Sequence, residues 1–174
     1  MAILTIARMG HPILARAAAP ILDPRDPALA SLATDMVETM VAAQGIGLAA
    51  PQIRVGLQLV LFSVPASRME DGSGVALTWL VNPEITPLSD LTEEAYEGCL
   101  SLPGLTGRVP RWSHIYYRGL DLQGRVIERE ATGFHARVVQ HECDHLWGRL
   151  YPSRMADIGS LAYCEELTDG EGES

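Results

Sequence analysis

Apolar residues recur at helical spacing within residues 26–45. The segment opens with Asp26 and Pro27, a combination typical of a helix start. The apolar positions that follow lie three or four residues apart: Leu29, Leu32, Ala33, Met36, Val37 and Met40. The pattern predicts an amphipathic helix that ends at Gly45.

A second helical pattern runs from Gly133 to Gly148, whose glycine suits a helix end. One stripe of this helix, at steps of four and three, comprises Phe134, Val138, His141 and His145. Both imidazoles are therefore expected to face inward, beneath two apolar side chains. A polar line on another side, either solvated or next to the site, comprises Arg137, Gln140 and Asp144. Cys143 points away from the histidines.

Shorter apolar segments predict strands at 57–62, 76–85, 113–118 and 126–130, with surface turns at 70–74 and 120–124. The first residues predict another short strand, followed by a turn at His11. Because strands outnumber helices, we expect an α+β fold. Antiparallel strands would pack around the central C-terminal helix, after the N-terminal amphipathic helix. One domain over residues 1–164 and a flexible acidic tail over 165–174 are expected.

Composition narrows the function classes. The 174 residues are 47% hydrophobic and 20% charged, which is typical of a globular protein. Thirteen basic and 22 acidic residues give a net charge of −9, which disfavours nucleic acid as a direct partner. We see neither a signal peptide nor an apolar run long enough for a membrane. Three cysteines without an export signal favour reduced thiols and a cytoplasmic protein.

The segment QHECDHLWG, residues 140–148, carries the candidate chemistry. His141 and His145 lie one turn apart with Glu142 beside them, an arrangement that suits a metal ion next to a general base. The alternative is two hydrogen-bonded core histidines. A catalytic metal takes about three protein ligands and keeps one position open for water. Two histidines therefore need a third partner.

Three candidates for that ligand stand in the sequence. Tyr151 occupies the position where metzincin peptidases have a third histidine. Glu165 and Glu166 lie at the distance typical of gluzincin peptidases, although in an acidic tail. Cys99, in EGCLSLPG, offers a thiolate suited to zinc or ferrous iron.

Three segments together resemble the signature of the peptide deformylase family: GIGLAAPQ (45–52), EGCLS (97–101) and QHECDHLWG (140–148). They match that family's motifs in order and separation, and the similarity extends over residues 4–155. These enzymes remove the formyl group from the N-terminal methionine of new polypeptides. The resemblance therefore implies a metal-dependent hydrolase that releases formate.

The resemblance also implies roles for individual residues. The metal ligands would be Cys99, His141 and His145, holding one divalent ion, ferrous iron first, with zinc, nickel or cobalt as alternatives. Metal-bound hydroxide would attack the formyl carbon while Glu142 acts as general base and acid. The developing oxyanion would accept hydrogen bonds from the Gln52 amide and the Leu100 backbone N–H.

Substrate contacts follow from the same resemblance. The backbones of Ile46, Gly47 and Gly98 would pair with an extended peptide, Gly47 lying next to the catalytic groups. Phe134 and Val138 would wall a pocket for the methionine side chain. Glu97 is either structural or a substrate contact.

Other residues are assigned to the protein scaffold. Cys143 and Cys164 are expected to be packing residues. His11, His114 and His135 are expected to lie at the surface or to form local hydrogen bonds.

The expected partners are N-formylmethionyl nascent peptides. Docking on the ribosome would not use a basic C-terminal helix, because the tail is acidic. We expect a monomer. Two competing hypotheses remain: an HExxH endopeptidase with Glu165 or Glu166 as third ligand, and a structural metal module with four protein ligands.

Overall fold

The computed structural model describes residues 2–69 and 71–167 of the chain. Its helices are α1 (Pro27–Ala42), α2 (Gly133–Leu146) and α3 (Cys164–Leu167). Its strands are β1 (Gly47–Ala49), β2 (Leu59–Val64), β3 (Val75–Pro87), β4 (Thr92–Cys99), β5 (Leu102–Trp112), β6 (His114–Leu120), β7 (Val126–Thr132) and β8 (Ala162–Tyr163). Short 3-10 helices are η1 (Pro12–Ala15), η2 (Ala50–Ile53), η3 (Ala66–Arg68), η4 (Tyr151–Arg154) and η5 (Ile158–Ser160).

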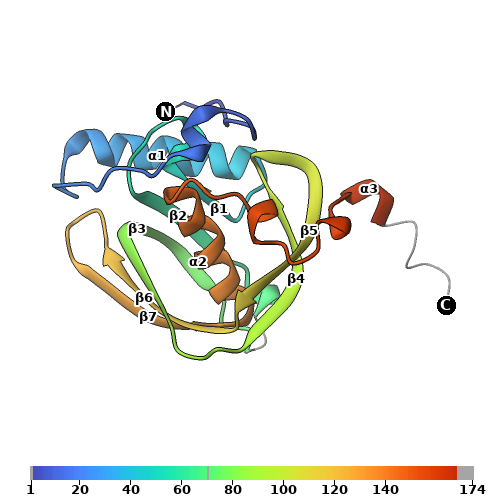
Figure 1. Ribbon diagram of the computed structural model, residues 1–174. Helices are drawn as coiled ribbons and strands as arrows, with labels where there is room; N and C mark the ends of the chain where they lie inside the picture. The colour runs from blue at the N-terminus through green and yellow to red at the C-terminus, as the bar shows by residue number, and fades with distance from the viewer. Residues whose placement is uncertain (1, 70, 168–174) are drawn as a thin grey trace.

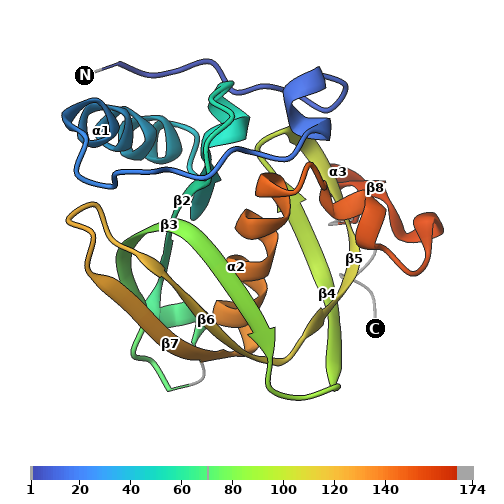
Figure 2. The same cartoon turned by 60° about the vertical axis from the view of Figure 1, so that its left-hand side comes forward.

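Helix α2 runs through the middle of the molecule between two antiparallel sheets (Figures 1 and 2). One sheet has the strand order β1-β2-β3-β6-β7, and the other has the order β4-β5-β8. Helix α1 packs beside β1 at one end of the larger sheet. This arrangement confirms the predicted α+β fold with antiparallel strands around a central C-terminal helix.

Strand β2 joins the two parts of the hydrophobic core. Its side chains alternate between the faces of the sheet, and both faces are covered. Val60, Phe62 and Val64 pack with α2, whereas Leu59 and Leu61 pack with the apolar stripe of α1. All five are at most 2% exposed, which explains why this strand reads as a continuous apolar run.

Helix α1 begins as its sequence predicts and ends slightly earlier. The Asp26 side chain accepts a hydrogen bond from the backbone N–H of Ala28 at 2.8 Å, and Pro27 follows in the first turn. The helix ends at Ala42, so the prediction that Gly45 ends it is wrong. Gln44, with φ 55°, takes the left-handed conformation instead. A Cβ atom at Gly45 would lie 2.9 Å from Cδ1 at the end of the Leu100 side chain, which can shift to make room.

Helix α2 is buried on nearly every side. Eleven of its 14 residues are buried, so it behaves as a core helix rather than a surface helix. Gly148 follows its last turn at φ 67°, where a Cβ atom would lie 2.7 Å from the backbone of Ala15. This contact ties the end of α2 to the N-terminal segment.

The burial of α2 rules out one of the two positions predicted for its polar residues, a solvated face or a place next to the site. Arg137, Gln140 and Asp144 are 5–6% exposed, so a solvated face is wrong. Their polar atoms instead bind neighbouring strands. Gln140 accepts a hydrogen bond from the backbone of Trp112 at 3.1 Å and donates one back at 2.9 Å.

Three further segments differ from prediction. Residues 2–8 form no strand, although Ala7 donates a backbone hydrogen bond to Gln52 at 2.7 Å. Strands β4 and β5 form a long hairpin that hydrophobic periodicity did not predict. The segment GIGLAAPQ, for which no helix or strand was predicted, contains β1 and most of η2.

The start of the acidic tail is ordered as part of α3, up to Leu167. Residues 168–174, on which the rest of the tail prediction falls, lie outside the described residues, and so does Glu70 in the predicted turn. No helix within the described residues has the length and apolar character needed to cross a membrane.

Candidate metal centre and active site

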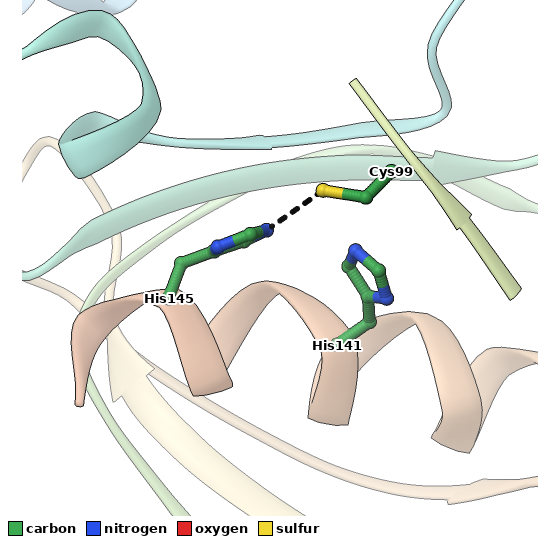
Figure 3. A group of neighbouring side chains, drawn as sticks. All are labelled: Cys99, His141 and His145. Carbon is green, nitrogen blue, oxygen red and sulfur yellow. Dashed lines mark hydrogen bonds between the residues drawn. The ribbon is translucent and has the colours of Figure 1, made fainter. Parts of the chain in front are cut away.

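Cys99, His141 and His145 meet in space, although the cysteine comes from a strand and both histidines come from a helix (Figure 3). Cys99 is the last residue of β4, where a bulge interrupts the pairing with β5, and both histidines project from α2. One ligand atom from each residue lies within 4.8 Å of the other two. The Cys99 sulfur is 3.5 Å from Nε2 of His145. Among the His, Cys, Asp and Glu residues of the described chain, Glu165 and Glu166 do not belong to this group.

Glu97 orients the first histidine. Its carboxylate lies 2.8 Å from Nδ1 of His141. Burial alone would raise the pKa of Glu97, but hydrogen bonds from Arg111 and His141 outweigh it and hold that pKa well below its usual range. An ionised carboxylate only accepts hydrogen bonds, so Nδ1 of His141 donates and Nε2 is left for a metal.

Two arginines neutralise the Glu97 carboxylate. Arg111 on β5 donates to both carboxylate oxygens at 2.9 Å, and Arg137 on α2 donates to one of them at 2.9 Å. All three side chains are at most 7% exposed. These partners occupy both carboxylate oxygens. The geometry therefore favours a structural role for Glu97 over a substrate contact.

Asp144 extends the network away from His141. It accepts hydrogen bonds from Arg111 at 2.5 Å and from Arg154 at 2.6 Å. Arg154 lies on η4 with a side chain that is 37% exposed, so the chain of charges reaches the surface. Sequence reasoning did not identify Arg111 or Arg154, which lie outside the recognised motifs.

His145 lies deeper than His141. It is 1% exposed, and burial, followed by the nearby His141, holds its pKa well below the usual range. A neutral imidazole is the form that binds a metal. Tyr151 stacks on the ring of His141 with the ring centroids 6.3 Å apart. That tyrosine therefore borders the centre without belonging to the ligand group.

Glu142 points into the space in front of Gly47. A Cβ atom at residue 47 would collide with the Glu142 carboxylate, so only glycine leaves that group in place. Glu142 is 5% exposed, and burial raises its pKa to about 7. One of its buried oxygens has no hydrogen-bond partner among the described residues. A carboxyl group with these properties suits proton transfer near neutral pH.

The Gln52 side chain is held in a fixed orientation beside Cys99. Its side-chain oxygen accepts a hydrogen bond from the backbone of Ala49 at 2.9 Å, which turns the amide nitrogen toward Cys99 and Ser101. That nitrogen lies 3.5 Å from the Cys99 sulfur and 3.2 Å from the Ser101 hydroxyl oxygen. The amide donor is thus fixed in direction beside the candidate metal ligand.

A cleft of about 1290 Å³ opens over these groups. All the predicted catalytic and substrate-contact residues line it: Ile46, Gly47, Gln52, Glu97, Gly98, Leu100, Glu142, Phe134 and Val138. Cys99 and His141 line it as well. Gly98 is exposed, and a Cβ atom there would meet only the backbone oxygen of Leu105, at 3.7 Å. Packing within the chain therefore does not explain this glycine.

Comparisons with known proteins agree with this geometry. The sequence pattern of the polypeptide deformylase family matches residues 3–160. The chain is 57% identical over 163 residues to peptide deformylase 1 of Bordetella pertussis (strain Tohama I), covering 93% of each chain. The chain belongs to the polypeptide deformylase family.

Solved deformylase structures share the fold. The peptide deformylase from Ehrlichia chaffeensis has a TM-score of 0.83 and 30% identity, over 91% of each chain. The Met-Ala-Ser-bound class I type b peptide deformylase from Acinetobacter baumannii has a TM-score of 0.82 and 37% identity. That match covers 88% of this chain and 99% of the other.

Deformylases are metal-dependent enzymes that act on the formyl group of N-terminal methionine, and the donor set here fits such an ion. Burial lowers the pKa of His141, but hydrogen bonds to Cys99 and Glu97 outweigh burial and hold that pKa well above its usual range. One thiolate and two imidazoles are ligands that Zn²⁺, Fe²⁺, Ni²⁺ and Co²⁺ accept.

The remaining cysteines and histidines lie apart from the candidate metal group. Cys143 is 4% exposed and packs in the core, as predicted, whereas Cys164 is exposed, so its assignment as a packing residue is wrong. His11 accepts a backbone hydrogen bond at the start of η1. His114 lies 3.2 Å from Glu130, and the buried His135 lies 3.1 Å from the Tyr117 hydroxyl.

Proposed function

We propose that the protein removes the formyl group from the N-terminal formylmethionine of newly made polypeptides, by hydrolysis to formate and a free amine. The observation that carries this proposal is the meeting of Cys99, His141 and His145 beside Glu142, in a chain of the deformylase family. A Met-Ala-Ser peptide is bound by a related deformylase. We infer that the cleft of this chain holds an N-terminal methionine in the same way.

In this proposal the metal is held by Cys99, His141 and His145, with Fe²⁺ as the working ion. A divalent ion there would supply Lewis acidity and lower the pKa of a water molecule in its open position. Glu142 takes a proton from the attacking water and delivers it to the leaving amine. The Gln52 amide and the Leu100 backbone N–H donate hydrogen bonds to the formyl oxygen as it gains negative charge.

The cleft also accounts for the substrate. The backbones of Ile46, Gly47 and Gly98 pair with the extended peptide. Phe134 and Val138 form a wall of the pocket that holds the methionine side chain. The chain acts as a monomer in the cytoplasm on nascent peptides, within one catalytic domain over residues 1–164. Docking on the ribosome would not involve a basic C-terminal helix.

The test is release of formate from a formyl-Met-Ala-Ser peptide by protein purified without oxygen, since thiolates are readily oxidised. We expect Glu142→Gln to keep its metal and lose about 10²- to 10⁴-fold in turnover. Full activity in Glu142→Gln would refute the proposed proton transfer. Cleavage of internal peptide bonds with the formyl group left in place would instead favour an endopeptidase.

Metal content separates the candidate third ligands. Cys99→Ala should lose the ion, whereas Glu165→Ala, in the short helix α3, should retain it. The opposite result would transfer the ligand role to the glutamate.

A further inference from the structure

The walls of the cleft carry a charge opposite to that of the whole chain. The net charge of the protein is −9, yet four arginines line the cleft: Arg8, Arg54, Arg68 and Arg137. Among its lining residues the acidic side chains are Glu97 and Glu142. Both are buried, and Glu97 is already neutralised by Arg111 and Arg137. A peptide that enters the cleft therefore meets mainly positive charge.

Three of these arginines are free to meet a ligand. Arg8, Arg54 and Arg68 are exposed, in contrast to the buried Arg137. Within residues 2–69 and 71–167 none of the three forms an ion pair. Among the described residues, no carboxylate is therefore paired with these three guanidinium groups.

Arg68 has the best-defined position. Its guanidinium carbon lies 4.2 Å from the centroid of the Phe134 ring, a cation–π contact. Phe134 stands in the first turn of α2 and lines the cleft with Val138. The ring holds the positive charge at the edge of the wall proposed for the methionine side chain. An arginine at this edge lines the cleft and is exposed, so it can pair with an acidic side chain of a bound peptide.

Arg8 and Arg54 add positive charge near Gln52. Arg8 lies between two anchored residues, since the Ala7 backbone donates to Gln52 at 2.7 Å and Met9 to Ser101 at 2.9 Å. Arg54 follows η2 directly, in a left-handed conformation with φ 65°. Besides Arg68 on η3, positive charge therefore lines the cleft from the N-terminal segment and from the end of η2.

We propose that this cleft selects formylated peptides with an acidic side chain in the residues directly after methionine, and that Arg68 is the main specificity-determining residue. The inference rests on the proposed deformylase function. An exposed ion pair changes affinity by about two- to fivefold, so one acidic side chain predicts a preference of about two- to fivefold over a neutral one. Basic side chains at the same positions are disfavoured.

The experiment compares C-terminally amidated peptides that differ in one side chain, formyl-Met-Xaa-Ser with Xaa as Glu, Gln or Arg. Amidation removes the terminal carboxylate as a second anion. We expect kcat/KM to fall in the order Glu, Gln, Arg. The spread should shrink when salt is raised from about 0.02 to 0.5 M, because the Debye length shortens severalfold.

Two variants locate the effect. Arg68→Glu should invert the order, so that the Arg peptide becomes the better substrate. Arg16→Glu, an exposed arginine outside the cleft lining, changes the net charge equally and should keep the wild-type order. Equal kcat/KM for the three peptides, or an order that Arg68→Glu leaves intact, would overturn the inference. Absence of formate from the Gln peptide would instead refute the deformylase function itself.

Discussion

The Glu97 carboxylate and the His141 imidazole are joined by a hydrogen bond of 2.8 Å. The bond fixes which ring nitrogen faces the Cys99 sulfur, since the nitrogen that donates to Glu97 is not available as a ligand. Glu97 lies on β4 and is held by Arg111 on β5, so the direction of the imidazole depends on two strands outside α2.

Replacing Glu97 should weaken metal binding without removing a ligand. Glu97→Gln keeps the size of the side chain but loses its charge and leaves Arg111 and Arg137 unbalanced. We expect the metal dissociation constant to rise about 10- to 100-fold and the free energy of unfolding to fall by about 3–5 kcal/mol. Competition with a chelator measures the first effect, and urea unfolding the second.

A matched control is Glu94→Gln on the same strand. Glu94 forms an exposed pair with Arg108 at 3.6 Å, and such pairs contribute about 1 kcal/mol or less. The Glu94→Gln variant should therefore retain wild-type metal affinity. If Glu97→Gln also retained it, the orienting role of Glu97 would be wrong.

A methyl group at residue 47 should displace the Glu142 carboxylate, because an added Cβ atom would occupy its place. A shift of about 1 Å in a catalytic group costs on the order of 10²-fold, so Gly47→Ala should lower kcat/KM by that amount with the metal retained. Formate release together with metal content checks this. Gly56→Ala is the control, since no atom lies within 4 Å of a Cβ atom there. Equal activity of the two variants would contradict the prediction.

The buried His135 should make stability depend on pH. Burial, followed by the charge of Arg129, lowers the pKa of His135 from 6.5 to about 4. As the pH falls below 6.5, the unfolded chain takes up a proton that the folded protein refuses. The contribution of His135 is therefore complete above pH 6.5, is lost progressively down to about pH 4 and changes no further below it. The loss amounts to roughly 3 kcal/mol.

The test measures the free energy of unfolding in urea at pH 6.5 and 4.5, and compares the change between the two pH values in the wild type and in His135→Gln. Glutamine still accepts a hydrogen bond from Tyr117 but does not titrate. The variant should lose less stability than the wild type over this range, and His114→Gln should behave like the wild type. The same pH dependence in all three proteins would exclude His135 as its source.

Local patterns predicted the helices well and the second sheet poorly. The caps and periodic apolar residues of α1 and α2 lie within each segment, so the sequence reports them directly. Strand β4 reads as TEEAYEGC, with most side chains exposed, and β5 contains Pro103 and Pro110. Their ladder, from the Thr92–Trp112 pair onward, depends on long-range pairing that no periodicity within a segment reveals.

The candidate site was predictable wherever its residues belong to a motif. Cys99 belongs to the segment EGCLS, and His141 and His145 belong to QHECDHLWG. The structure brings the three residues together. Arg111 was missed, and Tyr151 was considered only as a metal ligand, because a buried arginine or a stacked tyrosine looks like any other in a single sequence. The available signal was indirect: a glutamate buried next to a metal ligand needs a cation to balance it.

The insertion of α2 between the sheets has a consequence for the order in which the protein assembles during translation. Cys99 and His145 are 46 positions apart, and β4 and β5 leave the ribosome before α2 does. Until that helix arrives, the two sheets have no common core and the thiol has no imidazole partners. An ion held by these three residues would therefore bind late in biogenesis, after α2 has packed between the two sheets.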